Sequence, residues 1–368
     1  MQYKITANQA ALLLFVFMTS SSIINIPSPI ISFAGNLAWI SIMISACLGI
    51  LTILPVIWMA KRHPGLSYMQ YSRSIVGTPI TIVLGLPFLF FQLHMGAAIV
   101  LDIAMFLKSS MMRNTPSYWF IFLTFMVVAL SVRAGIDKVT GLFPILMGNV
   151  MFFVLLITLM SYKNYDIGNL LPLMPDGPKP LLHGIYFSYG FPFGEIILFT
   201  MIFPFIPSFG SRFTFKVIQA VLFTAISLAL TTVVTIMVFG PLAGERKYSL
   251  FEVARTVDII DVFQRIEALI GYSLVVASFM KTTIVLFTAH QTCAHLLGLK
   301  EDRMLIFPIA LLMACVSISA LMSGDAKWSY EVSTIHPLWG FICIVVPFIV
   351  VCAVDLIRGK KQPQASSS

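Results

Sequence analysis

The chain has 368 residues, of which 58% are hydrophobic and only 10% are charged. A soluble domain has about 25% charged residues, and it could not hide so much apolar surface from water. The composition therefore excludes a soluble globular protein and indicates an integral membrane protein. The formal net charge of +8 at pH 7 comes from loop residues and not from a basic stripe or nucleic-acid-binding motif, so we expect no nucleic-acid partner.

Ten runs of the sequence are apolar and long enough to cross a bilayer as helices. No Asp, Glu, Lys or Arg stands between Lys4 and Lys61, a stretch of 56 residues with room for two spans, because one crossing needs roughly 20 residues. We therefore expect an all-α integral membrane protein with ten transmembrane helices in a single domain, 1–368. The eight further spans that we expect are Pro79–Leu107, Ser117–Val132, Val139–Ser161, Gly184–Phe209, Val217–Phe239, Ala268–His290, Met304–Ser323 and Ile335–Val354.

The positions of Lys and Arg in the loops predict the orientation. Loops on the side of the N-terminus hold thirteen of these residues, whereas the opposite side holds nine, four of them in the long segment 241–267. Cytoplasmic loops carry the excess of positive charge. We therefore expect both termini in the cytoplasm, including a tail at 358–368.

The sequence offers no signal for catalysis, a metal or a cofactor. His290, Cys293 and His295 have the side chains of metal ligands, but no second cluster completes a site. We find no nucleophile elbow, no phosphate-binding loop and no pair of carboxylates at helical spacing. We therefore expect a binding or transport protein and not an enzyme, without a cofactor or metal.

Two predicted spans contain breaks, which a membrane tolerates only where protein or a water-filled cavity covers the backbone. The first span has hydroxyl side chains at 19–22 and then Pro27 and Pro29, and the sixth has two glycines and a proline within 190–195. Spans one and six each begin a five-helix half, and an odd number of helices gives the halves opposite orientations. We therefore expect two inverted repeats, at about 5–161 and 184–357, with the ligand site where the broken helices 1 and 6 meet.

Both breaks are expected near the middle of the membrane, because a helix rises about 1.5 Å per residue. Two alternatives to ligand binding stay open. The serines of the first break can bond backward to their own helix and bend it, and the acidic residue of the second can cap the half-helix that begins there. The residues that we expect around a small ligand are Ser20, Ser21, Ser22, Phe193, Gly194 and Glu195.

Besides Glu195, three ionisable residues inside predicted spans are functional candidates. Lys281 is the only Lys or Arg buried within a span and lies near the middle of the eighth. A charge at that depth costs roughly 2.5–3.5 kcal/mol on insertion scales, so it is a functional candidate. Lys281 can instead have a purely structural role, with its amine hydrogen-bonded to backbone carbonyls. His94 and Asp102 on the third span are weaker candidates, since the first can be a core histidine and the second can reach the outer surface.

The order and spacing of several short segments resemble the B subunit of spore-germination nutrient receptors, from about residue 5 to 357. This family is part of the amino acid–polyamine–organocation transporter superfamily. Lys281 falls where the family places a lysine, whereas the serines at 20–22 stand where its first break usually carries glycine. The matching segments are Pro27, Ala38-Trp39-Ile40-Ser41, Pro64-Gly65, Asn114-Thr115-Pro116, Leu170-Leu171-Pro172, Phe191-Pro192-Phe193-Gly194-Glu195, Gly240-Pro241 and Arg265-Ile266-Glu267.

The resemblance implies the LeuT-like fold of this superfamily and a receptor that senses a small nutrient, an amino acid or a sugar, in the inner membrane of a spore. It also implies a larger membrane A subunit and a lipoprotein C subunit as partners. Sodium-coupled members of the superfamily hold an ion between helices one and eight. The ammonium of Lys281 is expected to replace that ion by donating to carbonyls of the first break, or to carry a proton. A proton-coupled amino acid transporter is the alternative function.

Overall fold

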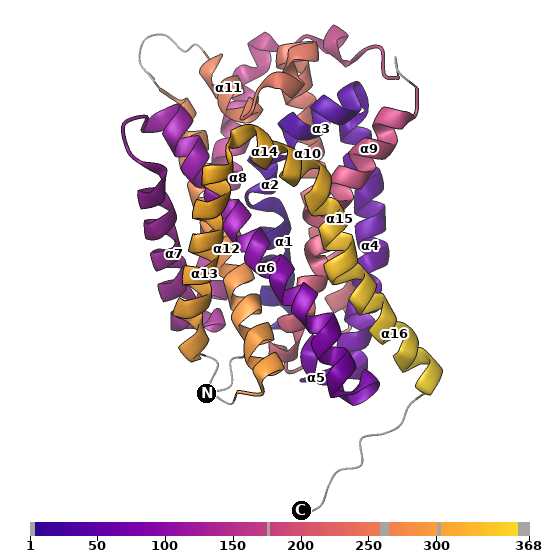
Figure 1. Cartoon of the computed structure of the whole chain (residues 1–368). Helices are drawn as coiled ribbons and strands as arrows, with labels where there is room; N and C mark the ends of the chain where they lie inside the picture. The colour runs from indigo at the N-terminus through magenta and orange to yellow at the C-terminus, as the bar shows by residue number, and fades with distance from the viewer. Residues whose placement is uncertain (1–3, 175–176, 258–264, 300–302, 360–368) are drawn as a thin grey trace, which may run out of the picture.

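The computed structural model describes residues 4–174, 177–257, 265–299 and 303–359, and these residues form helices and connecting loops without a β-strand. Nine helical stretches of the described residues are long and apolar enough to cross a membrane. The sixth span, divided by its break, supplies the tenth crossing (Figure 1). The predicted all-α architecture is confirmed. The predicted tail, 358–368, lies outside the described residues beyond Gly359.

The first five spans include the broken first helix and a short helix, α5, between the second and third spans. The elements in chain order are α1 (Ala7–Thr19), α2 (Ser22–Asn25), α3 (Pro27–Ala34), η1 (Gly35–Leu37), α4 (Ala38–Arg62), α5 (Tyr68–Val76), α6 (Thr78–Phe106), η2 (Leu107–Met111), α7 (Ser117–Ala134) and α8 (Ile136–Met160).

The second five spans follow two short turns, η3 (Ser161–Asn164) and η4 (Ile167–Leu170), and include the broken sixth span and a segmented tenth span. These elements are α9 (Lys179–Ser188), η5 (Tyr189–Phe193), η6 (Gly194–Met201), η7 (Phe203–Phe205), α10 (Phe213–Phe239), η8 (Gly240–Glu245), α11 (Ser249–Arg255), α12 (Glu267–Leu297), η9 (Arg303–Leu305), α13 (Ile306–Ser323), α14 (Asp325–Tyr330), η10 (Glu331–Ile335), α15 (His336–Gly340), η11 (Phe341–Val345) and α16 (Val346–Arg358).

Both predicted breaks are present. The first helix ends at Thr19, and Ser20 leaves helical geometry with φ −27° and ψ −106° before α2 begins. In the sixth span the non-helical residue is Phe191, with φ −146° and ψ 105°. A residue before proline is pushed from helical to extended backbone, so Pro192 explains this position. The chain then resumes as a 3₁₀ helix at Gly194, which confirms the predicted restart of the sixth helix.

Several helices run past the ends that hydropathy predicts. The eighth span was expected to stop at His290, but α12 continues to Leu297 and ends at Gly298, whose φ of 68° is readily adopted by glycine. The tenth was expected to start at Ile335, but α14 begins at Asp325. Apolar windows stop where polar residues begin, whereas helical hydrogen bonds continue into the interface.

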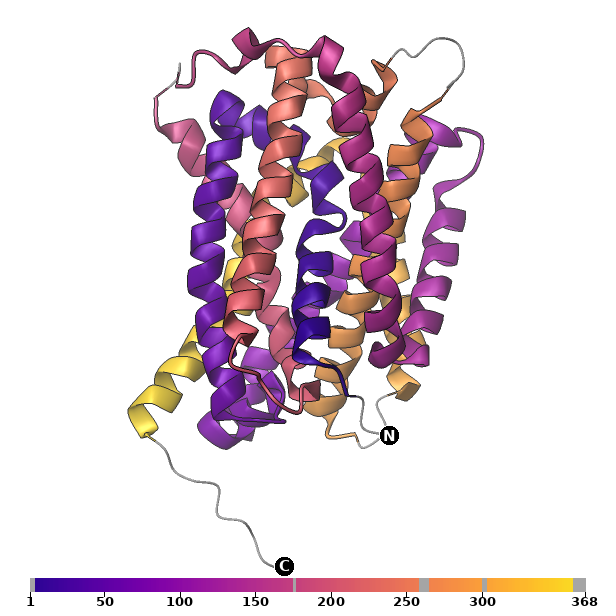
Figure 2. The same cartoon turned by 180° about the vertical axis from the view of Figure 1, so that it is seen from behind.

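The broken first helix lies at the centre of the bundle, where α1 packs against α8, α10 and α12 (Figure 2). The start of α1 and the end of α16 lie at the same end of the molecule (Figure 1). We call that end the inner face and the opposite end, where α3 and α11 lie, the outer face. The boundaries of the two predicted repeats, 5–161 and 184–357, stay a prediction.

Candidate functional site

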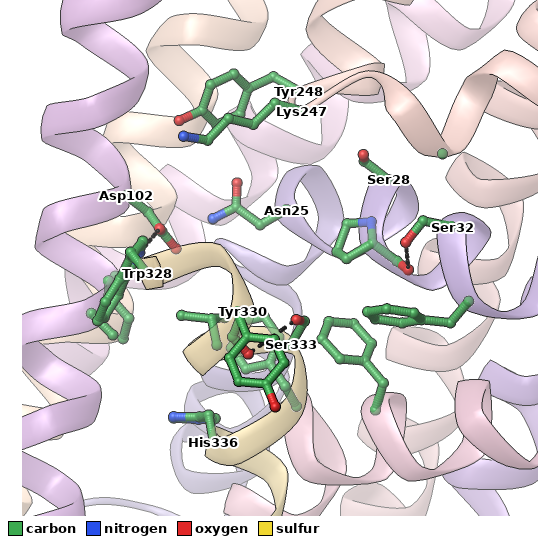
Figure 3. Close-up of a pocket in the computed structure, with 18 of the residues that line it drawn as sticks. Asn25, Ser28, Ser32, Asp102, Lys247, Tyr248, Trp328, Tyr330, Ser333 and His336 are labelled. Carbon is green, nitrogen blue, oxygen red and sulfur yellow. Dashed lines mark hydrogen bonds between the residues drawn. The ribbon is translucent and has the colours of Figure 1, made fainter. Parts of the chain in front are cut away.

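A cavity of about 680 Å³ lies toward the outer face, between the upper part of the first span, α6 and the start of the tenth span. We call it the main cavity. Lys247 and Tyr330 are exposed at its mouth, whereas Glu195 and His336 are buried in its floor. Figure 3 shows many of the lining side chains. The other residues that line it are Asn25, Ser28, Pro29, Ser32, Phe33, Met95, Ala98, Ile99, Asp102, Phe187, Phe191, Gly244, Glu245, Tyr248, Trp328, Val332 and Ser333.

Glu195 forms an ion pair with a lysine that lies beneath this floor. Lys281 Nζ on α12 is 2.7 Å from Glu195 Oε2 on η6, and the side chains are 0% and 1% exposed. The ammonium also lies 4.0 Å from the ring centre of Phe191 and 5.2 Å from that of Phe17. An aromatic face attracts a cation. The pair therefore ties the restarted sixth helix to the eighth, with both side chains almost fully buried.

Buried phenyl rings close the bundle between the ion pair and the inner face. Phe17 meets Phe199 at 5.5 Å between ring centres, Phe199 meets Phe203 at 5.8 Å, and Phe203 meets Phe213 at 5.4 Å. Edge-to-face contacts at these separations are favourable. The main cavity therefore opens toward the outer face, and a row of packed aromatic rings lies below it.

The inner ends of the second and tenth spans are joined by a second ion pair. Arg62 Nε on α4 lies 2.5 Å from Asp355 Oδ2 on α16, and His63 Nε2 lies 3.2 Å from the other carboxylate oxygen. Tyr71 on α5 stacks on the His63 ring at 5.5 Å. These contacts hold the inner face together around Asp355.

His336 begins α15 and borders the main ion pair. Its Nε2 lies 3.6 Å from Glu195 Oε1, which is slightly longer than a hydrogen bond. Its ring is 4.8 Å from that of Phe91 and 5.5 Å from that of His94. Its Nδ1 is buried and has no hydrogen-bond partner among the described residues. One ring nitrogen therefore faces the carboxylate and the other is available to a small polar molecule.

The two weaker candidates of the third span are placed differently. Asp102 lines the main cavity and accepts a hydrogen bond of 3.2 Å from Trp328 Nε1. His94 lies outside that cavity, with its ring 5.1 Å from Trp339 and 5.9 Å from Trp328. Asp102 therefore borders the candidate ligand space, whereas His94 reaches it only through His336.

The serines of the first break are buried but do not line the main cavity. Ser20 Oγ donates to the Val16 carbonyl, the backward bond that we considered as an alternative. The hydroxyls of Ser21 and Ser22 are buried without a hydrogen-bond partner in the described part of the chain. From the same span, the cavity receives Asn25 and residues of α3. A ligand role for the three serines stays a prediction.

Of the three sixth-span candidates, only Glu195 reaches the main cavity. Phe193 is buried against α4, where a Cβ on Gly49 would lie 3.0 Å from its ring. Gly194 is packed closely against the preceding turn, since a Cβ at this position would lie 3.1 Å from the Tyr189 carbonyl oxygen. Neither residue lines the cavity, and their role in binding also stays a prediction.

The contacts of Glu195 and Lys281 differ from those expected. No side-chain cap is formed at the start of η6, and the Glu195 carboxylate faces Lys281 instead. The ammonium of Lys281 makes no hydrogen bond to a carbonyl of the first break within the described residues. A carboxylate is a stronger partner for an ammonium than a neutral carbonyl is, so the ion pair forms in its place.

Sequence reasoning missed the contribution of the tenth span. His336, Trp328 and Tyr330 line the cavity, but the span was expected to begin at Ile335, which put them in or next to a loop. The signal available was the density of aromatic and charged residues in 325–336 directly before an apolar run.

A family model described as "Spore germination protein" matches residues 4–322. The chain belongs to this spore germination protein family. Spore germination protein KB of Bacillus subtilis (strain 168) is 22% identical over 369 residues, which cover 99% of this chain and 97% of the relative. Spore germination protein YndE of the same organism is 23% identical over 323 residues, covering 85% of this chain and 87% of the relative. The predicted family is thereby confirmed.

Solved structures of transporters share the fold of this germination protein. MhsT in complex with L-phenylalanine matches with a TM-score of 0.73 at 10% identity, covering 96% of this chain and 93% of the other. A Na⁺-coupled sialic acid symporter in a substrate-bound outward-open state matches with a TM-score of 0.67 at 14% identity, covering 94% and 80%. At these identities the likeness establishes the fold alone, and the predicted LeuT-like fold is confirmed.

Proposed function

We propose that this germination protein is the permease-like membrane subunit of a spore germinant receptor and that it binds a small nutrient in the main cavity. The observation that carries the proposal is the double position of Glu195. It lies in the floor of the main cavity and it also pairs with Lys281 at 2.7 Å. A molecule in the cavity can therefore act directly on a contact between two helices.

The ion pair supplies a physical route from binding to a change of conformation. A ligand amine that approaches Glu195 competes with Lys281 for the same carboxylate. Weakening that contact loosens the tie between η6 and α12. A ligand shifts an equilibrium only by binding one state more tightly, and a cavity that includes half of an interhelical ion pair meets this requirement.

The chemistry of the cavity suits an amino acid, with a sugar as the second ligand class. Asp102 and Glu195 offer carboxylates to an amine, and Lys247 at the mouth offers an ammonium to a carboxylate. The MhsT structure holds L-phenylalanine in a protein of the same fold. The hydroxyls of Ser28, Ser32 and Ser333 would suit a sugar.

The same proposal covers the location and partners of the protein. It lies in the inner membrane of a spore as a multi-pass protein, with both termini in the cytoplasm, and it works with a larger membrane A subunit and a lipoprotein C subunit. It acts by binding and not as an enzyme. Its relatives include spore germination proteins KB and A2 of Bacillus subtilis, which supports an assembly dedicated to germination.

A thermal-shift screen of the purified protein tests ligand binding directly. Amino acids, sugars and nucleosides are added singly to the full chain in detergent. A ligand at a hundredfold excess over its Kd stabilises the protein by about 2.7 kcal/mol, which raises the melting temperature. The proposal fails if no member of the three classes raises it, while a general stabiliser such as sucrose still does.

A proton-coupled amino acid transporter is the second candidate, favoured by the buried Lys281–Glu195 pair in a transporter fold. Both functions need the same cavity. They differ in turnover, so the discriminating measurement is uptake of a labelled ligand into proteoliposomes with an inward proton gradient. A receptor subunit binds the ligand without accumulating it, whereas a transporter accumulates it until the gradient is dissipated.

A further inference from the structure

A second cavity of about 310 Å³ lies beside the main cavity, between α6, α13 and the start of the tenth span. We call it the side cavity. His336 and Trp328 line both cavities and therefore form the wall between them. The other residues that line the side cavity are His94, Val316, Ser319, Ala320, Ser323, Lys327, Glu331, Ile335 and Trp339.

The side cavity combines apolar walls with an exposed pair of charged residues at its edge. Lys327 Nζ and Glu331 Oε1 are 3.9 Å apart with side chains 65% and 31% exposed, and charged groups of this kind do not face hydrocarbon. The hydroxyls of Ser319 and Ser323 continue the polar lining. At roughly 30 Å³ for each water, the space holds about ten waters. The side cavity therefore offers water an approach to His336 and His94 on a side that a ligand in the main cavity does not cover.

Titratable groups connect this water to the buried ion pair. The His94 and His336 rings are 5.5 Å apart between centres, His336 Nε2 is 3.6 Å from Glu195 Oε1, and Glu195 Oε2 is 2.7 Å from Lys281. The distance from His336 Nε2 to the carboxylate is about 0.4 Å longer than a hydrogen bond. A small movement of the ring would close this gap. Its Nδ1 is buried and has no partner among the described residues, so a water molecule that enters beside it would satisfy it.

We propose that His336 exchanges protons between the side cavity and Glu195, so that the buried ion pair can gain or lose a proton while a ligand fills the main cavity. A proton from water binds His336 Nδ1, and the proton on Nε2 passes to Glu195 Oε1. The imidazole ends neutral with its proton on the other nitrogen, and the neutral carboxyl group no longer attracts Lys281 as a charge. The return path reverses these steps.

Three carboxylates around His336 favour the uptake of a proton by its ring, whereas the Lys281 ammonium beside Glu195 favours the return of that proton. Glu195 faces it from η6 and Asp102 lies across the main cavity on α6, so two carboxylates attract a proton to the ring. Glu331 from η10 adds a third at the side cavity, where Lys327 partly neutralises it. The inference goes beyond the proposed function and holds for a receptor or a transporter.

Deuterium exchange at the carbon between the two ring nitrogens tests the route. This exchange needs a protonated ring and water access, and mass spectrometry reads each of the six histidines of the full chain. His183 is an exposed reference and His290 a buried one. The variants are Ser28→Trp, which places an indole in the main cavity, and Ser28→Trp combined with Ser319→Trp, which places one in each cavity.

Exchange at His336 is expected to persist in Ser28→Trp, because the side cavity still supplies water. The double variant should slow it by at least about tenfold, as for a site that exchanges only through local opening. Exchange at His183 should stay unchanged, and Ser323→Trp replaces Ser319→Trp if the latter does not fold. The inference is overturned if Ser28→Trp alone abolishes exchange at His336, or if the double variant leaves it unchanged. Ligand binding is measured separately, so failure here leaves the proposed function standing.

Discussion

Removing one partner of the Lys281–Glu195 pair should destabilise this protein far more than removing one partner of a surface pair. At 2.7 Å and an effective dielectric constant of about 20, two unit charges attract by about 6 kcal/mol. Desolvation offsets much of that, but removing one partner leaves the other charge buried alone, which costs about 3–5 kcal/mol. We therefore expect Lys281→Met, which keeps most of the side-chain volume, to lower the free energy of unfolding by about that amount.

A double-mutant cycle separates the ion pair from general packing. The free energy of unfolding is measured for wild type, Lys281→Met, Glu195→Gln and the double variant. The double variant should be more stable than the sum of the two losses predicts, because it leaves no lone buried charge. Arg255→Ala is the matched control, since the exposed Arg255–Glu252 pair at 3.2 Å should contribute no more than about 1 kcal/mol. Lys281→Met as mild as this control would refute the reasoning.

Three further predictions follow from single positions. Ser21→Leu should abolish the germinant response while the protein stays in the membrane, and an unchanged response in a spore germination assay would rule out a ligand role for that break. Lys281→Arg should have an impaired germinant response, because a planar guanidinium does not replace a compact ammonium. Ligand binding by the wild type should be equal in sodium and in potassium buffers, and a sodium requirement would contradict the replacement of a sodium ion by Lys281. Gly190→Ala should destabilise the protein, since its Cβ would lie 2.3 Å from that of Pro337, whereas Gly141→Ala, which meets nothing within 4 Å, should be tolerated; equal melting temperatures would show that the contact is not as close as described.

Local signals made most of the architecture predictable from sequence. Apolar runs define the spans because each helix must satisfy its own backbone in the membrane. Pro192 and the neighbouring glycines marked the sixth break, and the hydroxyl cluster at 19–22 marked the first. Lys281 stood out because a charged residue inside an apolar run is energetically costly. These features depend on a few neighbouring residues, so they can be recognised without the tertiary structure.

The partners of these residues depend on tertiary contacts and were not predictable in the same way. Glu195 was expected to bind a ligand, with a helix cap as the alternative that its local position allows, and the sequence did not predict its pairing with Lys281 on another helix. The wall formed by His336 and Trp328 required knowing that the tenth span begins ten residues before its apolar part, at Asp325. Side-chain types also could not show which residues of the first span line the main cavity. These residues are Asn25 and members of α3, whereas we expected the serines at 20–22.

The central claim is that the nutrient binds in the main cavity. Ligand binding by variants that carry a tryptophan in one of the two cavities tests it most directly. Ser28 is buried and lines the main cavity, whereas Ser319 lines only the side cavity. Isothermal titration calorimetry with the ligand found by the thermal-shift screen is carried out on wild type, Ser28→Trp and Ser319→Trp, each first checked for a wild-type melting temperature. We predict that Ser28→Trp shows no binding heat while Ser319→Trp keeps the wild-type Kd. Wild-type binding by Ser28→Trp would contradict the assignment of the main cavity as the nutrient site.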